Sequence, residues 1–465
     1  MIRDEIKPTL RLAVPVVLAE LGWMFMGVVD TVMVGPLGPA AIAATGVGTS
    51  LQMAFAIFGM GLLLGLDTLV SQAYGARDLP LCRAWLALGI RLAWLLTLPL
   101  VVVLAGVWLA IPLLGFHGDT LPLLQSYFAV LIVSTPFLLV YAAYRRYLQS
   151  THHVAPVMWA LVTANLVNAL ANWVCIYGRF GVPPLGVTGA AWATFASRVY
   201  MCGLLVAAAW WIHRTAPGAG GHVGEDRPAA GDRPAGLGAA VRGGDGAITS
   251  MRRLIRLGLP AASTVTAEVG VFAVATGLAG TLDPVATASH QIALNIAAVA
   301  FMIPLGLASA GAVRVGNAVG ANDPRGAAAA GWTVIAMGVA FMSLSGLLFV
   351  FVPRLLIGLF SKDPAVLGLG ASLLVIAAVF QLFDGLQGVV TGTLRGLGDT
   401  RTSMITNLAA HWAVGIPIGY TLCFAAGWGV RGLWWGLSAG LILAGVVLTT
   451  MWARRVAHYQ ASGRL

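Results

Sequence analysis

Five acidic residues lie inside long apolar segments of the chain, where charged side chains are rare: Glu20, Asp30, Asp67, Glu268 and Asp384. A charge near the centre of a bilayer costs roughly 2.5–3.5 kcal/mol on insertion scales, so such acids are candidates for function by default. Carboxylates in this setting can bind a cation or carry a proton. The sequence therefore offers ion or proton chemistry inside a membrane.

Glu268 and Asp384 form the first candidate site. Each sits near the middle of an apolar segment in the second half of the chain, and no Lys or Arg lies at that depth in either segment. Two acids without a cationic partner suit the binding of a proton, or of Na⁺ together with carbonyl and hydroxyl oxygens. The alternative stays open that both acids are protonated and only form structural hydrogen bonds.

Asp30 belongs to a second candidate site, in the first half of the chain. It lies in the outer half of its segment, while Asn168 and Asn172 are four residues apart on another segment and so share a helix face. Amides inside a membrane commonly bridge helices. Beside Asp30 they would instead form its hydrogen-bond network, and the sequence leaves both uses open.

Asp67 and Arg91 lie at similar depths on consecutive antiparallel segments. We predict that they form a structural ion pair near the cytoplasmic ends of these segments, because buried charges are best accommodated as partners. The sequence assigns no role to Glu20 or to Arg198, the other arginine within a predicted span.

The elements that position these residues are membrane helices. The 465 residues are 59% hydrophobic and only 9% charged, against about 25% charged residues in soluble proteins, which excludes a soluble fold. Many apolar runs are long enough to cross a hydrocarbon core of about 30 Å as a helix. Hydropathy and turn residues predict an all-α polytopic membrane protein whose twelve helices cover residues 10–34, 40–72, 81–114, 121–148, 155–178, 185–212, 253–280, 285–318, 328–358, 365–394, 400–426 and 430–456.

The basic residues predict the orientation. The net charge is +10, and Lys and Arg gather on the cytoplasmic side of membrane proteins. With both termini cytoplasmic, most basic residues near span ends fall inside, and only Arg179, Arg354, Lys362 and Arg431 fall outside. The four cysteines lie in or beside apolar runs and act as small hydrophobic residues, so we expect neither a disulfide nor a cysteine-bound metal.

The two halves of the chain resemble each other. LRLAVP, which ends at Pro15, recurs as IRLGLP, which ends at Pro260, and LVSQAYGARD, which ends at Asp78, recurs as RVGNAVGAND, which ends at Asp323; both pairs are 245 residues apart. An even number of spans in each copy makes the two repeats parallel, as in transporters that hold substrate between their lobes. Pro15 and Pro260 fall inside the first helix of each repeat, where a proline permits a bend.

The duplication defines the domains. A segment over residues 214–249 is rich in Gly, Ala, Pro, Arg and Asp and has almost no large apolar side chains, which is typical of a flexible linker. We predict an N-terminal six-helix lobe over residues 1–213, this linker on the cytoplasmic side, and a C-terminal six-helix lobe over residues 250–465.

Six stretches identify the chain as a member of the MATE family (multidrug and toxic compound extrusion), in its NorM-like branch. They are GVVDTVMVGPLG from Gly27, LVSQAYGARD from Leu69, NWVCIYGRFGVPPLGVTGAA from Asn172, AEVGVFA from Ala267, SHQIALNIAAVAFMIPLGLASAGAVRVGNAVGANDP from Ser289 and FQLFDGLQGVVTGTLRGLGDT from Phe380. The resemblance implies two six-helix lobes around a central cleft. It also implies a secondary active exporter of drugs and organic cations, driven by alternating access and the inward flow of Na⁺ or H⁺.

The resemblance also implies roles for particular residues. Asp30, with Asn168 and Asn172, is similar to a substrate- or proton-coupling site, and Glu268 and Asp384 are similar to a cation site that could hold Na⁺. Pro15 resembles the proline at which the first helix bends, and Pro260 is its counterpart in the second repeat.

A further set of residues is expected to line the cleft: Gln291, Asn295 and Phe380. Phe380 stands where some relatives carry a tyrosine, so a hydroxyl ligand is missing there. We expect no cofactor other than the coupling ion, cationic drugs as partners, no nucleic acid, and a monomer in the bacterial inner membrane.

Other functions are less well supported. A lipid-linked saccharide flippase of a related superfamily is the alternative, but such proteins usually have more spans and a cationic cleft, whereas the candidate residues here are acidic. The sequence has no G-x-x-x-x-G-K-[ST] loop for a nucleotide-driven pump and no H-E-x-x-H metal site for an intramembrane enzyme. Carboxylates serve both ions, so the choice between Na⁺ and H⁺ stays open.

Overall fold

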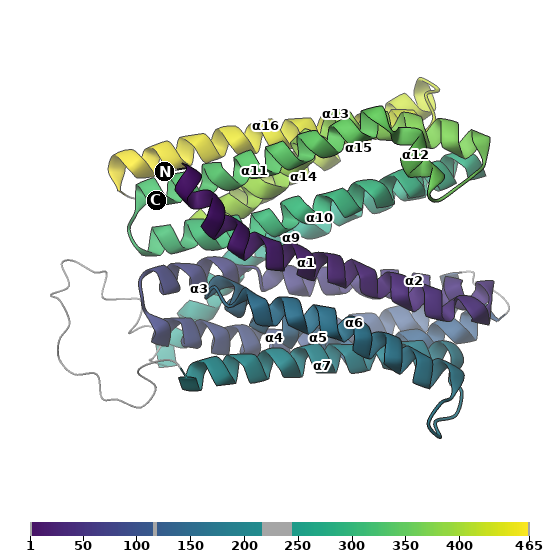
Figure 1. The fold of residues 1–465 in the computed structure, drawn as a ribbon, viewed down its shortest axis with the longest axis horizontal. Helices are drawn as coiled ribbons and strands as arrows, with labels where there is room; N and C mark the ends of the chain where they lie inside the picture. The colour runs from purple at the N-terminus through teal and green to yellow at the C-terminus, as the bar shows by residue number, and fades with distance from the viewer. Residues whose placement is uncertain (1, 115–118, 216–243, 464–465) are drawn as a thin grey trace. The chain divides into compact units, whose positions relative to one another are not determined.

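The computed structural model describes residues 2–114, 119–215 and 244–463, and every regular element in these ranges is a helix (Figure 1). The first half contains α1 (Ile2–Val34), α2 (Pro39–Leu62), α3 (Gly65–Gly75), α4 (Leu79–Ala110), α5 (Thr120–Ser150), α6 (Val154–Tyr177) and α7 (Gly186–Thr215). The second half contains α9 (Gly244–Gly280), α10 (Pro284–Gly320), α11 (Pro324–Phe351), α12 (Pro353–Gly358), α13 (Pro364–Leu397), α14 (Thr400–Leu408), α15 (Ile416–Tyr420) and α16 (Val430–Ser462).

Twelve stretches of helix in these ranges are long and apolar enough to cross a membrane. The second stretch joins α2 to α3, and the eleventh joins α14 to α15 through a π-helical segment, Ala409–Gly415, and ends in another, Thr421–Ala425. The prediction of an all-α polytopic membrane fold is confirmed.

Some helix boundaries differ from the predicted ones for identifiable reasons. The ninth predicted helix reaches residue 358, but α11 ends at Phe351 and Pro353 begins the separate helix α12. A proline has no backbone N–H and clashes with the preceding turn, so it can break a helix, as Pro353 does after the non-helical Val352. Helices α1 and α9 begin at Ile2 and Gly244, earlier than predicted, because hydropathy does not detect the charged turns before an apolar run.

Aspartate side chains begin five of the described helices. Asp78, Asp283, Asp323, Asp363 and Asp399 each accept a hydrogen bond from a backbone N–H in the first turn of the helix that follows. Four of these helices also have a proline within their first two positions. Both features suit the unpaired N–H groups of a helix start, so the sequence encodes where these helices begin.

The backbone repeats with the same spacing as the sequence. Arg77 and Asn322, 245 residues apart, have φ angles of 58° and 54°, and His152 and Gly398, 246 residues apart, have φ angles of 64° and 92°. Residues other than glycine rarely adopt positive φ. The recurrence of this unusual conformation in equivalent turns supports two copies of one six-helix repeat.

The described residues form two compact units. The N-terminal unit comprises residues 22–74 and 78–256, and the C-terminal unit comprises residues 1–21, 75–77 and 257–465. The first 21 residues therefore group with the C-terminal unit, whereas the sequence places them in the N-terminal lobe. Glu5 forms an ion pair with Arg314 of α10, and the backbone of Val17 packs closely on Gly306 of the same helix, so these residues are held against α10. Most of the predicted linker, residues 216–243, lies outside the described residues.

Helices α10 and α13 approach each other closely within the C-terminal unit. A Cβ atom at Gly392 or Gly396 would collide with the carbonyl oxygens of Ala308 and Ala312 on α10. Glycine alone permits such an approach, and small residues at interfaces are how membrane helices commonly associate. Backbone contact therefore fixes the register of α13 on α10.

The two predicted bends lie inside helices. Pro15 falls within α1 and Pro260 within α9, and both helices continue through the proline. Thr264 donates to the carbonyl oxygen of Pro260 at 2.9 Å. A role for these prolines as moving parts stays a prediction.

Candidate functional site

Asp30, on α1, lies in a cluster of polar side chains of the N-terminal unit. Asn172 Nδ2 donates to Asp30 Oδ1 at 2.7 Å and to Asn168 Oδ1 at 3.1 Å. From α7, Thr194 Oγ1 lies 3.3 Å from Asp30 Oδ2 and is a further donor. The structure thus brings together the predicted residues Asp30, Asn168 and Asn172. We call these three side chains, together with Thr194, the Asp30 cluster.

A buried arginine supplies positive charge near this cluster. Arg198 lies one helical turn after Thr194 on α7, is only 4% exposed, and is close enough for its charge to act on Asp30. Its guanidinium group donates to Gln52 Oε1 at 2.9 Å and to Ser134 Oγ at 2.5 Å. Arg198 therefore offsets the charge of Asp30 from a distance and is held in place by α2 and α5.

The Asp30 cluster also contains an unsatisfied amide oxygen. Asn172 Oδ1 is buried and has no hydrogen-bond partner among the described residues. A buried polar atom without a partner costs about 1–3 kcal/mol, so water or a ligand would bind favourably beside it. The cluster therefore combines a carboxylate with an unpaired amide acceptor.

The other two predicted acids lie near each other in the C-terminal unit. Glu268 of α9 and Asp384 of α13 lie close enough for their charges to repel each other, and the Gln387 side chain lies beside the Glu268 carboxylate. Asp384 is 6% exposed. Across the described residues, neither acid takes part in an ion pair. We call Glu268 and Asp384 the acid pair.

Amide groups connect the acid pair to the eleventh span. Gln387 Nε2 donates to Asn407 Oδ1 on α14 at 3.0 Å, while Gln387 Oε1 is buried without a partner in the described part of the chain. Trp412, in the π-helical segment Ala409–Gly415, donates from Nε1 to the carbonyl oxygen of Ala267 at 3.1 Å. Segments of π-helix often occur at functional sites. Two carboxylates and a free amide oxygen are the oxygen-rich surroundings that hard cations prefer.

Asp67 is paired, but not with Arg91. The Asp67 carboxylate lies 3.6 Å from the Arg146 guanidinium group on α5. Arg91 occupies the exposed side of α4, whose buried side includes Gly89 and Leu92. The predicted Asp67–Arg91 pair is wrong because depth along a helix does not determine which face a side chain occupies.

The three residues predicted to line the cleft differ in their exposure. Gln291 and Asn295 are exposed and lie four residues apart on one face of α10. Phe380 is only 3% exposed, and its ring packs against Trp434 in the core, with centroids 5.8 Å apart. The expectation that Phe380 lines a cleft is corrected: this face of α13 packs against α16.

Sequence reasoning missed several polar neighbours of the acids. Thr194 precedes Arg198 by four residues, and Gln387 follows Asp384 by three, so each shares a helix face with a charge inside the membrane. Asn407 lies on a helix that carries no acid within its apolar part. A search for amides and hydroxyls three or four positions from intramembrane charges could have found Thr194 and Gln387, but not Asn407.

Comparison with known families finds the same duplication. The MatE family model matches residues 15–174 and again residues 260–421, once in each half of the chain. The chain is 38% identical over 463 residues to a probable multidrug resistance protein NorM from Burkholderia pseudomallei, covering 97% of this chain and 92% of that protein. It is also 38% identical over 450 residues to the multidrug resistance protein NorM from Burkholderia vietnamiensis, covering 95% and 92%.

Solved structures share the fold. The eukaryotic MATE transporter AtDTX14 superposes with a TM-score of 0.83 at 21% identity, with 99% of each chain covered. A multidrug resistance MATE family transporter in an outward-facing conformation gives a TM-score of 0.81 at 20% identity, with 98% of this chain and 97% of that chain covered. The resemblance seen in the sequence is confirmed: the chain belongs to the MatE family and its NorM-like branch, and is a membrane transporter and not an enzyme.

Proposed function

We propose that this chain is a secondary active multidrug exporter, in which the inward movement of Na⁺ or H⁺ drives the outward movement of drugs by alternating access. Support for drug export comes from the relatives named multidrug resistance protein NorM, which match nearly the whole chain. The proposal places the protein in the bacterial inner membrane as a monomer with both termini in the cytoplasm.

The acid pair is the observation that carries ion coupling. Glu268 and Asp384 lie together without an ion-pair partner in the described residues, and the free Gln387 Oε1 adds a neutral oxygen. A cation or proton bound here would relieve the repulsion between the two carboxylates. The acid pair is therefore our candidate site for the coupling ion.

The Asp30 cluster is our candidate for contact with the drug or with a second proton. Its carboxylate accepts hydrogen bonds from Asn172 and Thr194, and Arg198 lies one helical turn beyond Thr194 on α7. An exchange between drug and proton at this carboxylate would connect binding to transport. An acidic site favours cationic drugs, and this argues against an anionic lipid-linked saccharide as the cargo.

Purified protein in proteoliposomes provides the test. We expect efflux of a fluorescent organic cation under an imposed Na⁺ or H⁺ gradient, each applied alone. Glu268→Gln and Asp384→Asn keep the side-chain volume and remove the charge, so each should abolish most gradient-driven efflux while drug affinity in detergent changes by less than about threefold. This contrast is expected because an interaction with a charged group is worth about 1.5–3 kcal/mol, or roughly ten- to hundredfold.

Asp363→Asn is the matched control, because it removes an exposed acid yet keeps an N-cap residue. It should transport like the wild type. If the Glu268 and Asp384 variants keep the full ion dependence of the wild type, the coupling site lies elsewhere. If neither gradient drives efflux by the wild type, the transport mechanism itself is refuted.

A further inference from the structure

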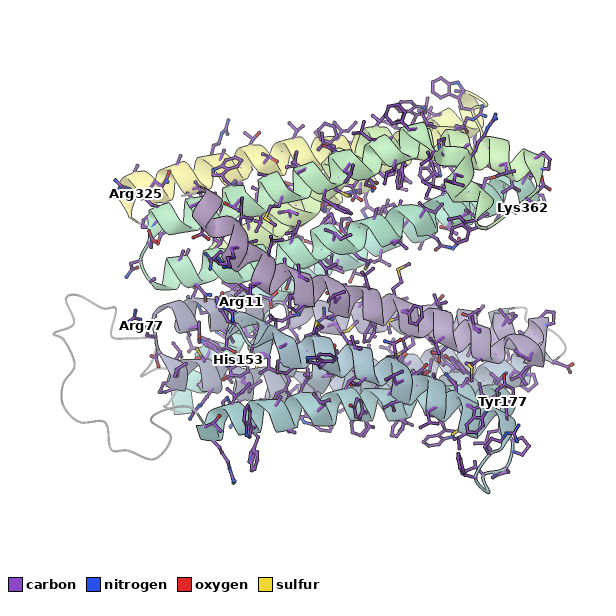
Figure 2. All side chains as sticks on the ribbon, viewed as in Figure 1. Arg11, Arg77, His153, Tyr177, Arg325 and Lys362 are labelled. Carbon is purple, nitrogen blue, oxygen red and sulfur yellow. The ribbon has the colours of Figure 1, made fainter. Side chains whose placement is uncertain are left out.

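An open groove of about 510 Å³ lies in the C-terminal unit, bounded by the end of α11, the short helix α12 and the first turns of α13. It is found near the α12–α13 connection, which contains Lys362, at the end of this unit opposite Arg325 (Figure 2). We call it the α12 groove. Neither the acid pair nor the Asp30 cluster contributes a residue to it.

The sequence creates this groove through a helix break and a missing side chain. Val352, with φ −130° and ψ 37°, leaves the helical conformation before Pro353, so α12 turns away from the axis of α11. Gly368 lines the groove from α13, and a Cβ atom at this position would meet no other atom within 4 Å. The groove is therefore open above Gly368, because no side chain packs on this glycine.

The lining is mostly apolar and faces outward. Phe351, Leu355 and Val375 line the groove and are 76%, 65% and 43% exposed. Apolar side chains at the end of a membrane span are covered by lipid in a bilayer. An acyl chain is thus the natural occupant of this part of the groove.

One arginine lines the groove and a second bonds to one of its lining residues. Arg354 lines it from α12, and Arg431 of α16 donates from Nε to Oγ of Ser372, another lining residue, at 3.0 Å. In the described part of the chain, no acid forms an ion pair with either arginine. Asp363, in the same connection, is engaged as the cap of α13 through the backbone N–H groups of its first turn.

The position of these arginines is unusual for a membrane protein. In the proposed orientation they belong to the four basic residues on the outer side, where Lys and Arg are normally depleted. One of these four, Arg354, lines the groove, and another, Arg431, is bonded to the lining residue Ser372. A guanidinium group has the geometry and permanent charge to bind phosphate oxygens in pairs, and basic sites between membrane helices bind lipid headgroups.

We propose that the α12 groove is a binding site for one anionic phospholipid. The phosphate lies between Arg354 and Arg431 and accepts their hydrogen bonds, with Ser372 at its edge. One acyl chain lies along Phe351, Leu355 and Val375 and fills the space above Gly368. This site is independent of drug and ion coupling and places a lipid against the α11–α12 break.

Native mass spectrometry of the purified full chain, titrated with phosphatidylglycerol or phosphatidylcholine, tests the proposal. The wild type should bind the first phosphatidylglycerol at least about fivefold more tightly than phosphatidylcholine, because each arginine near a headgroup contributes roughly a factor of five. Arg354→Gln and Arg431→Gln together should remove this preference. Lys362→Gln removes a basic residue at the same end, outside the groove lining, and should keep it.

A second variant tests the acyl chain separately from the charge. Gly368→Trp should fill the groove and weaken both lipids, whereas a headgroup or free phosphate alone would be unaffected. Gly106→Trp, at an exposed position of α4 where a Cβ also meets no atom within 4 Å, is the control. Equal binding of the two lipids by the wild type, or an unchanged preference in the double arginine variant, would overturn the proposal, as would unchanged binding in Gly368→Trp.

Discussion

At the residue scale, Asp30 is the acid whose surroundings are best defined, because two hydrogen bonds reach its carboxylate from α6 and α7. We predict that Asp30→Asn and Asn172→Ala each reduce drug efflux from cells about tenfold or more, since a hydrogen bond to a charged group is worth about 1.5–3 kcal/mol. Efflux should be measured at matched membrane levels of protein.

Asn165 provides the control for this prediction. It lies on the same helix as Asn172, but its Nδ2 donates to the carbonyl oxygens of Gly22 and Leu161 and not to Asp30. Asn165→Ala should therefore keep most of the efflux activity. If Asp30→Asn cells resist cationic drugs as well as wild-type cells do, Asp30 has only a structural role.

A second residue-scale prediction concerns the ion pair between Asp67 and Arg146. The two groups are 3.6 Å apart, with side chains 1% and 17% exposed. Asp67→Asn and Arg146→Gln should each lower the thermal midpoint in detergent, and the double variant should lose less than the sum, with a coupling of about 0.5–3 kcal/mol. Arg91→Gln, on the exposed side of α4, should change little. If the losses of stability in the two single variants add up to that of the double variant, the interaction between Asp67 and Arg146 does not stabilise the protein.

These residues also show what the sequence could predict of the site. Residue type and hydropathy were enough to find Asp30, Glu268 and Asp384, because a carboxylate in an apolar run is conspicuous. They failed for Arg91 and Phe380, where the outcome depends on which neighbouring helix each side of α4 or α13 contacts. That information lies in the packing of distant segments and not in local spacing.

At the scale of elements, equivalent turns of the two repeats should respond equally to mutation. Gly186 and Gly429 are 243 residues apart, have φ angles of 56° and 57°, and have no atom within 4 Å of a Cβ position. Alanine at either position is strained by its backbone conformation alone. Gly186→Ala and Gly429→Ala should each cost about 1–3 kcal/mol, seen as a lower thermal midpoint.

The control for this prediction is again Gly106, which lies in a helix with equally open space around its Cβ position. Gly106→Ala should be neutral or stabilising, because alanine is the better helix former by about 1 kcal/mol. Equal midpoints for all three alanine variants would mean that positive φ carries no cost in these turns.

The helices themselves were largely predictable, since twelve apolar runs separated by Asp, Pro and Gly define twelve spans. Their internal irregularities were not. The break between α2 and α3 is flanked by Gly61 and Gly65, and the π-helical segment Ala409–Gly415 is followed by Pro417. Glycine and proline in an apolar run do not specify which irregularity the helix adopts. Pro353 likewise marks the start of α12, and the hydropathy prediction did not use it.

At the scale of the whole molecule, the orientation in the membrane can be tested with single cysteines in a variant whose four native cysteines are replaced. Arg325 and Lys362 are exposed and lie at opposite ends of the C-terminal unit (Figure 2). With cytoplasmic termini, a membrane-impermeant maleimide should label Lys362→Cys in intact cells, but Arg325→Cys only after permeabilisation. The reverse pattern would invert the topology and place the α12 groove in the inner leaflet.

The division into units was only partly predictable from the chain. The spacing of the sequence repeats predicted where the first six-helix repeat ends and the second begins. It did not predict that the first 21 residues group with the C-terminal unit. The sequence gives no sign of this, because Glu5 and Arg314 are more than 300 residues apart and meet only in the folded protein.

The backbone contact between α10 and α13 has a mechanical consequence. The backbones of α10 and α13 touch at Gly392 and Gly396. The two helices therefore cannot slide along each other without first separating, and we expect them to move as one rigid unit. The exposed pair Gln291 and Asn295 is carried by α10, and Asp384 by α13. A side chain at Gly392 would collide with the carbonyl oxygen of Ala308 and push the two helices apart, so it would change the position of Asp384 relative to Gln291 and Asn295.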